Sequence, residues 1–213
     1  MANTTHQIWN LLDKDPPLRR DLSRGLLNIR AVAHFLTKNY NLDSSTHAII
    51  SAIRRYPNVE DTHLKNSKIS EVLKNSRIAT KTRIISISLN REKRSLEILQ
   101  KIIPMIAFGK GEVLRFSEGR EKLKILIDQH KKEDVLKIIP HDLVVGTKEN
   151  LGELSINFGD GSGTTIGVLA TIMTEIALKN INIIEAISCF PEYMIFVEEK
   201  DLLKAYEVLL NFL

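Results

Sequence analysis

Cysteine is nearly absent from this chain of 213 residues, where Cys189 is the only one. A single cysteine excludes an internal disulfide and a zinc site built from several cysteines. None of the six histidines forms a His-x-x-x-His pair, the spacing that places two metal ligands on one helix face. The sequence therefore predicts no metal site and no cofactor.

Long hydrophobic runs are also missing. No apolar stretch approaches the ~20 residues that a membrane helix needs. The first residues, MANTTHQIWNLL, lack the basic and apolar regions of a secretory signal. We therefore expect a cytoplasmic protein without a membrane partner, and the single cysteine fits that compartment.

Signatures of catalysis are scarce as well. The segment Gly159–Gly163 is rich in glycine but lacks the Gly-Lys-Ser/Thr ending of a phosphate-binding loop. Acidic residues such as Asp128, Glu133 and Asp134 are better explained as helix-start and surface charges than as catalytic carboxylates. We therefore predict a protein that is not an enzyme and has no catalytic residues.

The net charge of +4 is unevenly distributed along the chain. Residues 1–68 carry 10 basic and 6 acidic side chains, residues 69–150 carry 17 and 11, and residues 151–213 carry 3 and 9. The three segments therefore have net charges of +4, +6 and −6. This split indicates separate modules, and the basic front could pair with the acidic back of another copy.

The last third of the chain alternates between strand and helix periodicity. Apolar and polar residues alternate from Glu153 to Phe158, which is the period of a half-buried strand. A glycine-rich loop follows, and apolar residues then recur at helical spacing from Leu169 to Ile176. Beyond this helix the pattern predicts two strands and a closing helix, at Ile183–Ile187, Tyr193–Val197 and Lys200–Leu213. The order β-α-β-β-α is typical of a ferredoxin-like unit.

These motifs resemble the ACT domain family, and in particular the ACT domain that ends aspartokinases. The matching residues are Gly167-Val168-Leu169 at a helix start, Asn180-Ile181-Asn182-Ile183 at a strand start, and Ser188 and Glu192 in the next turn. The resemblance covers roughly residues 151–213 and implies a ligand-sensing module, usually for an amino acid, that works in pairs. The chain departs from the family in the residues before Gly167, where an acidic residue and a proline are common.

The resemblance also implies that the ligand binds where the loop of one unit meets a strand of a neighbouring unit. A ligand carboxylate would bind the backbone amides near Ile166–Val168, because the start of a helix attracts anions. Gly167 keeps the approach to these amides free of a side chain, and Asn182 would bind the ligand amine or side chain. The predicted ligand-binding residues are Thr164, Thr165, Ile166, Gly167, Val168 and Asn182.

The middle of the chain repeats the same order of elements. Strands are predicted at Thr82–Leu89, Glu112–Phe116 and Leu123–Ile127, helices at Leu96–Ile106 and Glu133–Ile139, and a further short strand at Leu143–Val145. The pair of units resembles the tandem ACT units of aspartokinase regulatory regions. The first copy has Asn90-Arg91-Glu92-Lys93 where the second has its turn glycine, so we expect the second copy to hold the ligand.

The N-terminal segment has a helical pattern from Gln7 to Tyr56. Pro16-Pro17 interrupts it, and Ser44 or Ser45 is the expected N-cap of the last helix. Three short helices with a tight turn before the third would suit a helix-turn-helix, with Arg54 and Arg55 contacting DNA. We favour a helical cap with solvated or paired arginines, because a net charge of +4 is mild for a DNA-binding domain.

The sequence thus predicts an α+β protein with three domains. These are a helical domain at 1–75, with a winged-helix-like fold as one interpretation, a degenerate ACT-like domain at 76–148 and an ACT domain at 149–213, the last two being ferredoxin-like βαββαβ units. The expected function is a non-enzymatic, homo-oligomeric regulator of amino-acid metabolism that senses an amino acid. Two alternatives stay open: an amino-acid-responsive transcription regulator that binds DNA, and a regulatory subunit of a separate biosynthetic enzyme.

Overall fold

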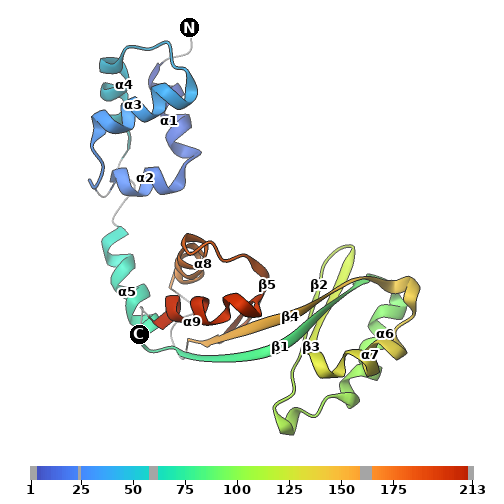
Figure 1. The fold of residues 1–213 in the computed structure, drawn as a ribbon. Coiled ribbons are helices and arrows are strands. Elements are labelled where there is room, and N and C mark those ends of the chain that lie inside the picture. Colours follow the sequence, from blue (N-terminus) through green and yellow to red (C-terminus); the bar gives the residue numbers. More distant parts are fainter. Residues whose placement is uncertain (1–3, 24, 58–61, 159–164, 211–213) are drawn as a thin grey trace. The chain divides into compact units, whose positions relative to one another are not determined.

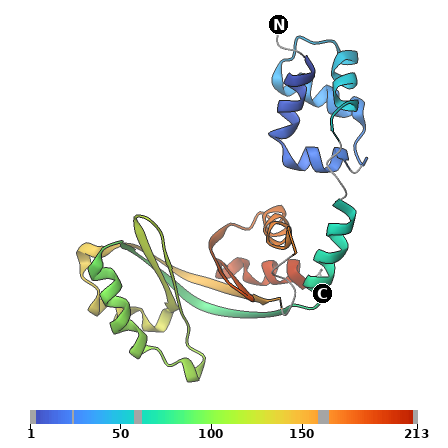
Figure 2. The same cartoon turned by 180° about the vertical axis from the view of Figure 1, so that it is seen from behind.

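The computed structural model describes residues 4–23, 25–57, 62–158 and 165–210 (Figures 1 and 2). The chain divides into two compact units, Met1–Asn66 and Ser67–Leu213, here called the helical unit and the sheet unit. Helix α5 (Thr62–Lys74) spans this boundary. Its residues Ile69 and Leu73 belong to the core of the sheet unit, although the sequence placed them in the first domain.

The helical unit contains four helices before α5, where the sequence predicted three. They are α1 (Thr4–Asp13), α2 (Pro16–Ser23), α3 (Ile29–Tyr40) and α4 (Thr46–Arg54). The side chain of Asn28 caps α3 by accepting hydrogen bonds from the amides of Arg30 and Ala31. Ser45 caps α4 through the amide of Ala48, which confirms one of the two predicted caps. The described part of this unit contains no strand that could serve as a wing.

The sheet unit is built on one antiparallel sheet of six strands in the order β2-β3-β1-β4-β6-β5. The strands are β1 (Arg77–Asn90), β2 (Leu114–Glu118), β3 (Lys122–Asp128), β4 (Val144–Asn157), β5 (Ile183–Cys189) and β6 (Glu192–Glu198). The main helices are α6 (Lys93–Ile102), α7 (Lys132–Ile138), α8 (Val168–Leu178) and α9 (Leu202–Leu210). This mixture of helices and antiparallel strands confirms the predicted α+β class.

Two long strands, β1 and β4, run through the centre of the sheet and pair with each other from Arg77↔Asn157 to Leu89↔Val144. Each has 14 residues, whereas the sequence predicted a shorter first strand and split β4 into two pieces. The predicted domain boundary at 148/149 therefore falls inside β4. The pairing is irregular between Lys81 and Ile84, beside which Arg83 adopts a left-handed backbone conformation.

Each end of the sheet carries its own pair of helices (Figure 1). Helices α6 and α7 bury residues such as Ile98 and Val135 against β1 and β3. Helices α8 and α9 bury residues such as Ile172 and Ala205 against β4 and β6. Burial of a large apolar side chain stabilises a fold by about 1.5–3 kcal/mol, so these two cores hold the sheet unit together.

The sheet also bends, which brings β3 close to the edge strand β5. Lys124 of β3 forms an ion pair with Glu185 of β5 at 2.5 Å, although three strands separate β3 from β5 in the sheet order. A small cluster of buried residues fills the inside of this bend: Ile84, Val113, Leu126, Leu151, Met194 and Phe196.

Candidate ligand-binding site

The predicted ligand loop ends at Gly167, which is the N-cap of α8. Its φ of +95° lies in the left-handed region that glycine adopts readily. The carbonyl oxygen of Gly167 accepts hydrogen bonds from the amide of Thr171 at 2.9 Å and from its hydroxyl at 3.0 Å. These bonds fix the first turn of α8, whose leading amides have no partner within the helix.

A pocket of about 370 Å³ lies beside this helix start. Its walls come from the end of β4, the first turn of α8 and the turn between β5 and β6. The lining residues are Phe158, Thr165, Gly167, Val168, Leu169, Ala170, Ser188, Phe190, Pro191, Glu192 and Tyr193. The amide of Phe158 donates to the carbonyl oxygen of Pro191 at 3.1 Å, which ties the end of β4 to the β5–β6 turn.

The structure brings three of the six predicted ligand residues, Thr165, Gly167 and Val168, into the wall of this pocket. Ile166 is not part of the lining and its side chain is 75% exposed. Thr164 lies outside the described residues.

Asn182 is exposed and precedes β5, whereas the pocket is at the far end of that strand. A strand rises about 3.3 Å per residue, so roughly 20 Å separates Asn182 from Ser188. One copy of the chain therefore does not bring Asn182 to the pocket, and its role in binding stays a prediction.

Sequence reasoning missed the aromatic part of the lining. Phe158 and Tyr193 were assigned to strands only, and Phe190 received no role. The one available signal was the β5–β6 turn, where the family resemblance had already singled out Ser188 and Glu192. Strand pairing brings Ser188 and Glu192 close to the loop before α8, and a linear sequence pattern does not reveal that pairing.

The polar groups of the pocket are few. Oε1 of Glu192 accepts a hydrogen bond from the hydroxyl of Ser155 at 3.1 Å. Burial raises the pKa of Tyr193, whose side chain is 7% exposed. Glu192 is the only ionisable side chain besides Tyr193 in the part of the lining that the structure describes, so a ligand ammonium group finds one carboxylate there.

A second carboxylate, Glu153, is buried in the centre of the sheet close to Glu192. Its Oε1 accepts a hydrogen bond from Arg115 at 3.2 Å, and its Oε2 has no hydrogen-bond partner. Burial raises the pKa of Glu153, and the charge of Glu192 raises it further, while Arg115 and Lys81 oppose the shift. Glu153 thus connects the pocket strand β4 with the β2–β3 hairpin.

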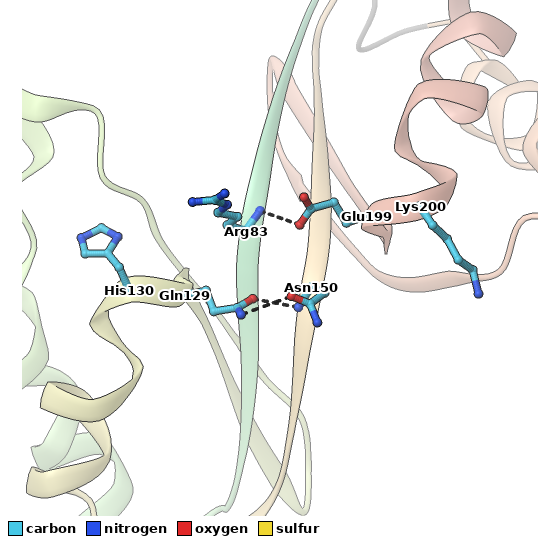
Figure 3. Close-up of a pocket in the computed structure, with 6 residues that line it drawn as sticks. All are labelled: Arg83, Gln129, His130, Asn150, Glu199 and Lys200. Carbon is cyan, nitrogen blue, oxygen red and sulfur yellow. Dashed lines mark hydrogen bonds between the residues drawn. The ribbon is translucent and has the colours of Figure 1, made fainter.

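Another pocket, of about 740 Å³, opens where the two halves of the sheet meet (Figure 3). Oε2 of Glu199 accepts a hydrogen bond from the amide of Arg83 at 3.0 Å, and Oε1 of Gln129 accepts one from the amide of Asn150 at 2.9 Å. Arg83 and Asn150 both have left-handed backbones, with φ of 56° and 55°. Since Glu199 and Gln129 are engaged in holding these two irregular points, we assign this pocket a structural role.

The two predicted DNA-contacting residues lie at the end of α4. Arg55 is held by the protein itself, because its Nη2 donates to Oγ1 of Thr5 and its Nε donates to the carbonyl oxygen of Ser51, both at 3.2 Å. Arg54 is exposed and forms no ion pair with the residues that the structure describes. Arg54 is thus the better placed of the two for an outside partner.

The described residues carry neither a candidate metal site nor a membrane-spanning helix. No group of three or more His, Cys, Asp or Glu side chains there is arranged to hold a metal ion. None of the helices in that part of the chain has the length and apolar character of a membrane span.

Comparison with known proteins gives matches among solved structures alone. No family model matches this chain, and no curated protein sequence matches it. The aspartate kinase of Clostridium acetobutylicum matches with a TM-score of 0.52 and 20% identity, over 63% of this chain and 34% of the enzyme. This chain therefore spans about a third of the length of that enzyme.

Two further matches cover almost the whole length of the matched chain. A structure of aspartokinase alpha and beta subunits matches with a TM-score of 0.51 and 16% identity, over 63% of this chain and 95% of that chain. The regulatory subunit of aspartate kinase from Thermus flavus matches with a TM-score of 0.51 and 11% identity, over 65% and 96%. The fold resembles that of aspartokinase regulatory regions. The ACT resemblance inferred from the sequence is confirmed at the level of fold, and more than a third of this chain lies outside each match.

Proposed function

We propose that this protein is a non-enzymatic regulator of amino-acid metabolism that senses an amino acid through an ACT-like unit. The observation that carries the proposal is the pocket at the start of α8, in a sheet unit that resembles aspartokinase regulatory regions. Pockets that bind small molecules typically measure about 300–1,000 Å³, so its volume of about 370 Å³ suits an amino acid.

The sheet unit is interpreted here as two ACT-like halves that share their central strands. One half uses α6, α7, β2, β3, the C-terminal part of β1 and the N-terminal part of β4. The other half uses α8, α9, β5, β6 and the opposite ends of these two long strands, where Arg77–Lys81 pairs with Glu153–Asn157. Because β1 and β4 cross both halves, a change in one half can be transmitted to the other along these strands.

The ligand carboxylate would bind the leading amides of α8, near Ile166–Val168. Aligned peptide dipoles and unpaired amides favour an anion at that place. Gly167 leaves these amides accessible, since it has no side chain. A matching glycine is missing in the first half, where Asn90-Arg91-Glu92-Lys93 precedes α6, so the second half is proposed to hold the ligand.

Regulation requires that the ligand bind two arrangements of the protein with unequal affinity. The arrangement proposed to change is the pairing of two copies. Strand β5 is an edge strand with one partner strand in the described sheet, and it leads directly into the pocket turn at Ser188–Glu192. A ligand that orders this turn would alter the same edge that a second copy uses.

A thermal-shift screen of the twenty amino acids tests this function. A ligand that binds the native state at 100 times its Kd raises the free energy of unfolding by about 2.7 kcal/mol. For a chain of this size that corresponds to roughly 5–10 °C in Tm. The D-enantiomer of any hit is the matched control. If no amino acid raises Tm at millimolar concentration, the proposed function is wrong.

A DNA-binding regulator is the second candidate, and the surface of α4 favours it. His47, Ser51 and Arg54 are exposed and recur at helical spacing, so they share one face of the helix. The turn Asn41–Ser45 joins this helix to α3 as in helix-turn-helix proteins. Salt-dependent binding of duplex DNA would support this candidate.

A further inference from the structure

The walls of the α8 pocket are mostly apolar, which bears on the kind of ligand that it takes. Phe158 and Tyr193 are each 7% exposed and form the deep part of the lining. Phe190 and Leu169 are 64% and 37% exposed, although phenylalanine and leucine side chains are usually buried. A ligand with an apolar side chain would cover these two exposed residues and remove their surface from water.

The charges of the pocket argue in the same direction. The lining contains no lysine, arginine or histidine among the residues that the structure describes, so an acidic ligand side chain would find no cation there. A basic ligand side chain would compete with the ligand's own ammonium group for Glu192. An unpaired charge in a partly buried site is costly, and this disfavours both kinds of side chain.

We propose that the ligand of this pocket is an α-amino acid with a large apolar side chain, aliphatic or aromatic. This inference rests on the proposed function. The ligand ammonium pairs with the carboxylate of Glu192, whose Oε1 already accepts a hydrogen bond from the hydroxyl of Ser155. The ligand side chain lies against Phe190, Tyr193 and Leu169. The β5–β6 turn, which supplies Phe190 and Glu192, is therefore the part of the chain that selects the ligand.

Two variants and one control test the position of the side chain. Ala170→Phe places a ring in the pocket from an exposed position on the first turn of α8, and Phe190→Ala removes the exposed ring. Thr174→Phe is the matched control, because Thr174 is also exposed, lies one turn further along α8 and is not part of the lining. Titration calorimetry on the full chain should show binding of leucine or phenylalanine weakened about tenfold or more in the first two variants. Binding to Thr174→Phe should be unchanged.

The ammonium contact is tested with Glu192→Gln and with N-acetyl-leucine, which has the same side chain and carboxylate but no charged amine. Glu192→Gln should weaken leucine binding about tenfold or more, whereas Glu175→Gln on α8, outside the lining, should not. N-acetyl-leucine should bind the wild-type chain more weakly than leucine and be insensitive to Glu192→Gln. Circular dichroism and Tm verify that each variant is folded.

The outcomes separate this inference from the proposed function. If lysine, aspartate or threonine binds more tightly than leucine and phenylalanine, and Ala170→Phe still blocks it, the ligand class is wrong while the proposed function stands. If apolar amino acids bind but neither Phe190→Ala nor Glu192→Gln changes their affinity, the assigned contacts are overturned. If none of the twenty amino acids binds, both the inference and the proposed function fail.

Discussion

Arg115 and Glu153 form an ion pair between β2, an edge strand, and β4, a central strand, with 3.2 Å between Nη2 and Oε1. The side chain of Glu153 is 4% exposed and that of Arg115 is 27% exposed. Arg115 also donates from Nε to the sulfur of Met194 on β6. This arginine therefore holds the β2–β3 hairpin over the inside of the bent sheet, at the cost of burying one carboxylate.

The pH dependence of stability should report on Glu153. Burial raises its pKa in the folded protein, so the folded state binds the proton more tightly than the unfolded state. The stabilisation is therefore complete below the unfolded pKa and is lost as pH rises through the folded pKa, at about 1.4 kcal/mol per pH unit between the two. Glu153→Gln imitates the protonated form. Urea unfolding between pH 4.5 and 8 should show the variant gaining stability relative to wild type as pH rises.

Arg115→Met provides the matched change in the partner. Removal of the guanidinium leaves Glu153 buried without its cation, which raises its folded pKa further and should cost roughly 1–3 kcal/mol at neutral pH. The decline of stability with pH should then be steeper than in wild type. Parallel curves for wild type and both variants would show that Glu153 does not titrate in this range.

Gly167 should resist substitution for two separable reasons. Its φ of +95° strains any other residue, and an added Cβ would lie 3.3 Å from Cδ1 of Ile69. Gly167→Ala should therefore cost about 1–2 kcal/mol. Gly111→Ala is the control, because Gly111 has φ of +80° with nothing within 4 Å of an added Cβ. Equal losses in urea unfolding would assign the whole effect to backbone strain, and Gly167→Val should in addition abolish amino-acid binding.

Gly152 allows α9 to approach β4. An added Cβ would lie 2.8–2.9 Å from three side-chain atoms of Leu202, closer than real Cβ atoms come. Gly152→Ala should destabilise the sheet unit by about 1–3 kcal/mol. The effect should shrink when Leu202 is also replaced by alanine, and Gly146→Ala on the same strand should be nearly neutral because its surroundings are open. Thermal unfolding of these three variants, and of Leu202→Ala alone, would reveal whether the Leu202 contact is responsible.

The sequence located some elements within a residue or two and missed others for physical reasons. Strands β3, β5 and β6 were predicted to within two residues because each is a short, mostly apolar run bounded by polar turns, which is a local signal. Strand β4 was predicted in two pieces, since Gly146–Lys148 is exposed and its pairing with β1 is decided by the partner strand. The predicted helix extended to Ile106, whereas α6 ends at Ile102. Pro104 interrupts the regular helix, and a 3-10 turn spans Ile103–Met105.

The residues of the candidate site were predictable where neighbours in the sequence define them, and not where the fold brings distant segments together. Gly167 and Val168 were identified because a glycine before an apolar helical pattern is a local signal. The contribution of Phe158, Phe190 and Tyr193 depends on three segments meeting in space. Asn182 was placed in the site through the family resemblance, and its distance from Ser188 shows that a contact with this pocket would require a second copy of the chain.

Oligomerisation is expected from the edge strand β5 and the opposite charges of the front and back of the chain. Sedimentation at tens of micromolar should give at least twice the chain mass of 24.2 kDa. Part of the attraction is electrostatic, so association should weaken between 0.05 and 0.5 M salt, for which about a threefold shorter screening length applies. A monomer at every concentration tested would contradict this prediction and leave Asn182 without a route to the ligand.

DNA binding, if the helical unit has this activity, should depend on Arg54 more than on Arg55. Arg54 is exposed, whereas Arg55 already donates to Thr5 and Ser51. Arg54→Ala should weaken binding of duplex DNA and lower the slope of log K against log salt by about 1, because one fewer phosphate is neutralised. Arg20→Ala is a control, since Arg20 pairs with Asp21 on α2. Fluorescence anisotropy from 50 to 200 mM salt measures both quantities, and the absence of any binding by the wild-type chain at 50 mM would eliminate the DNA-binding candidate.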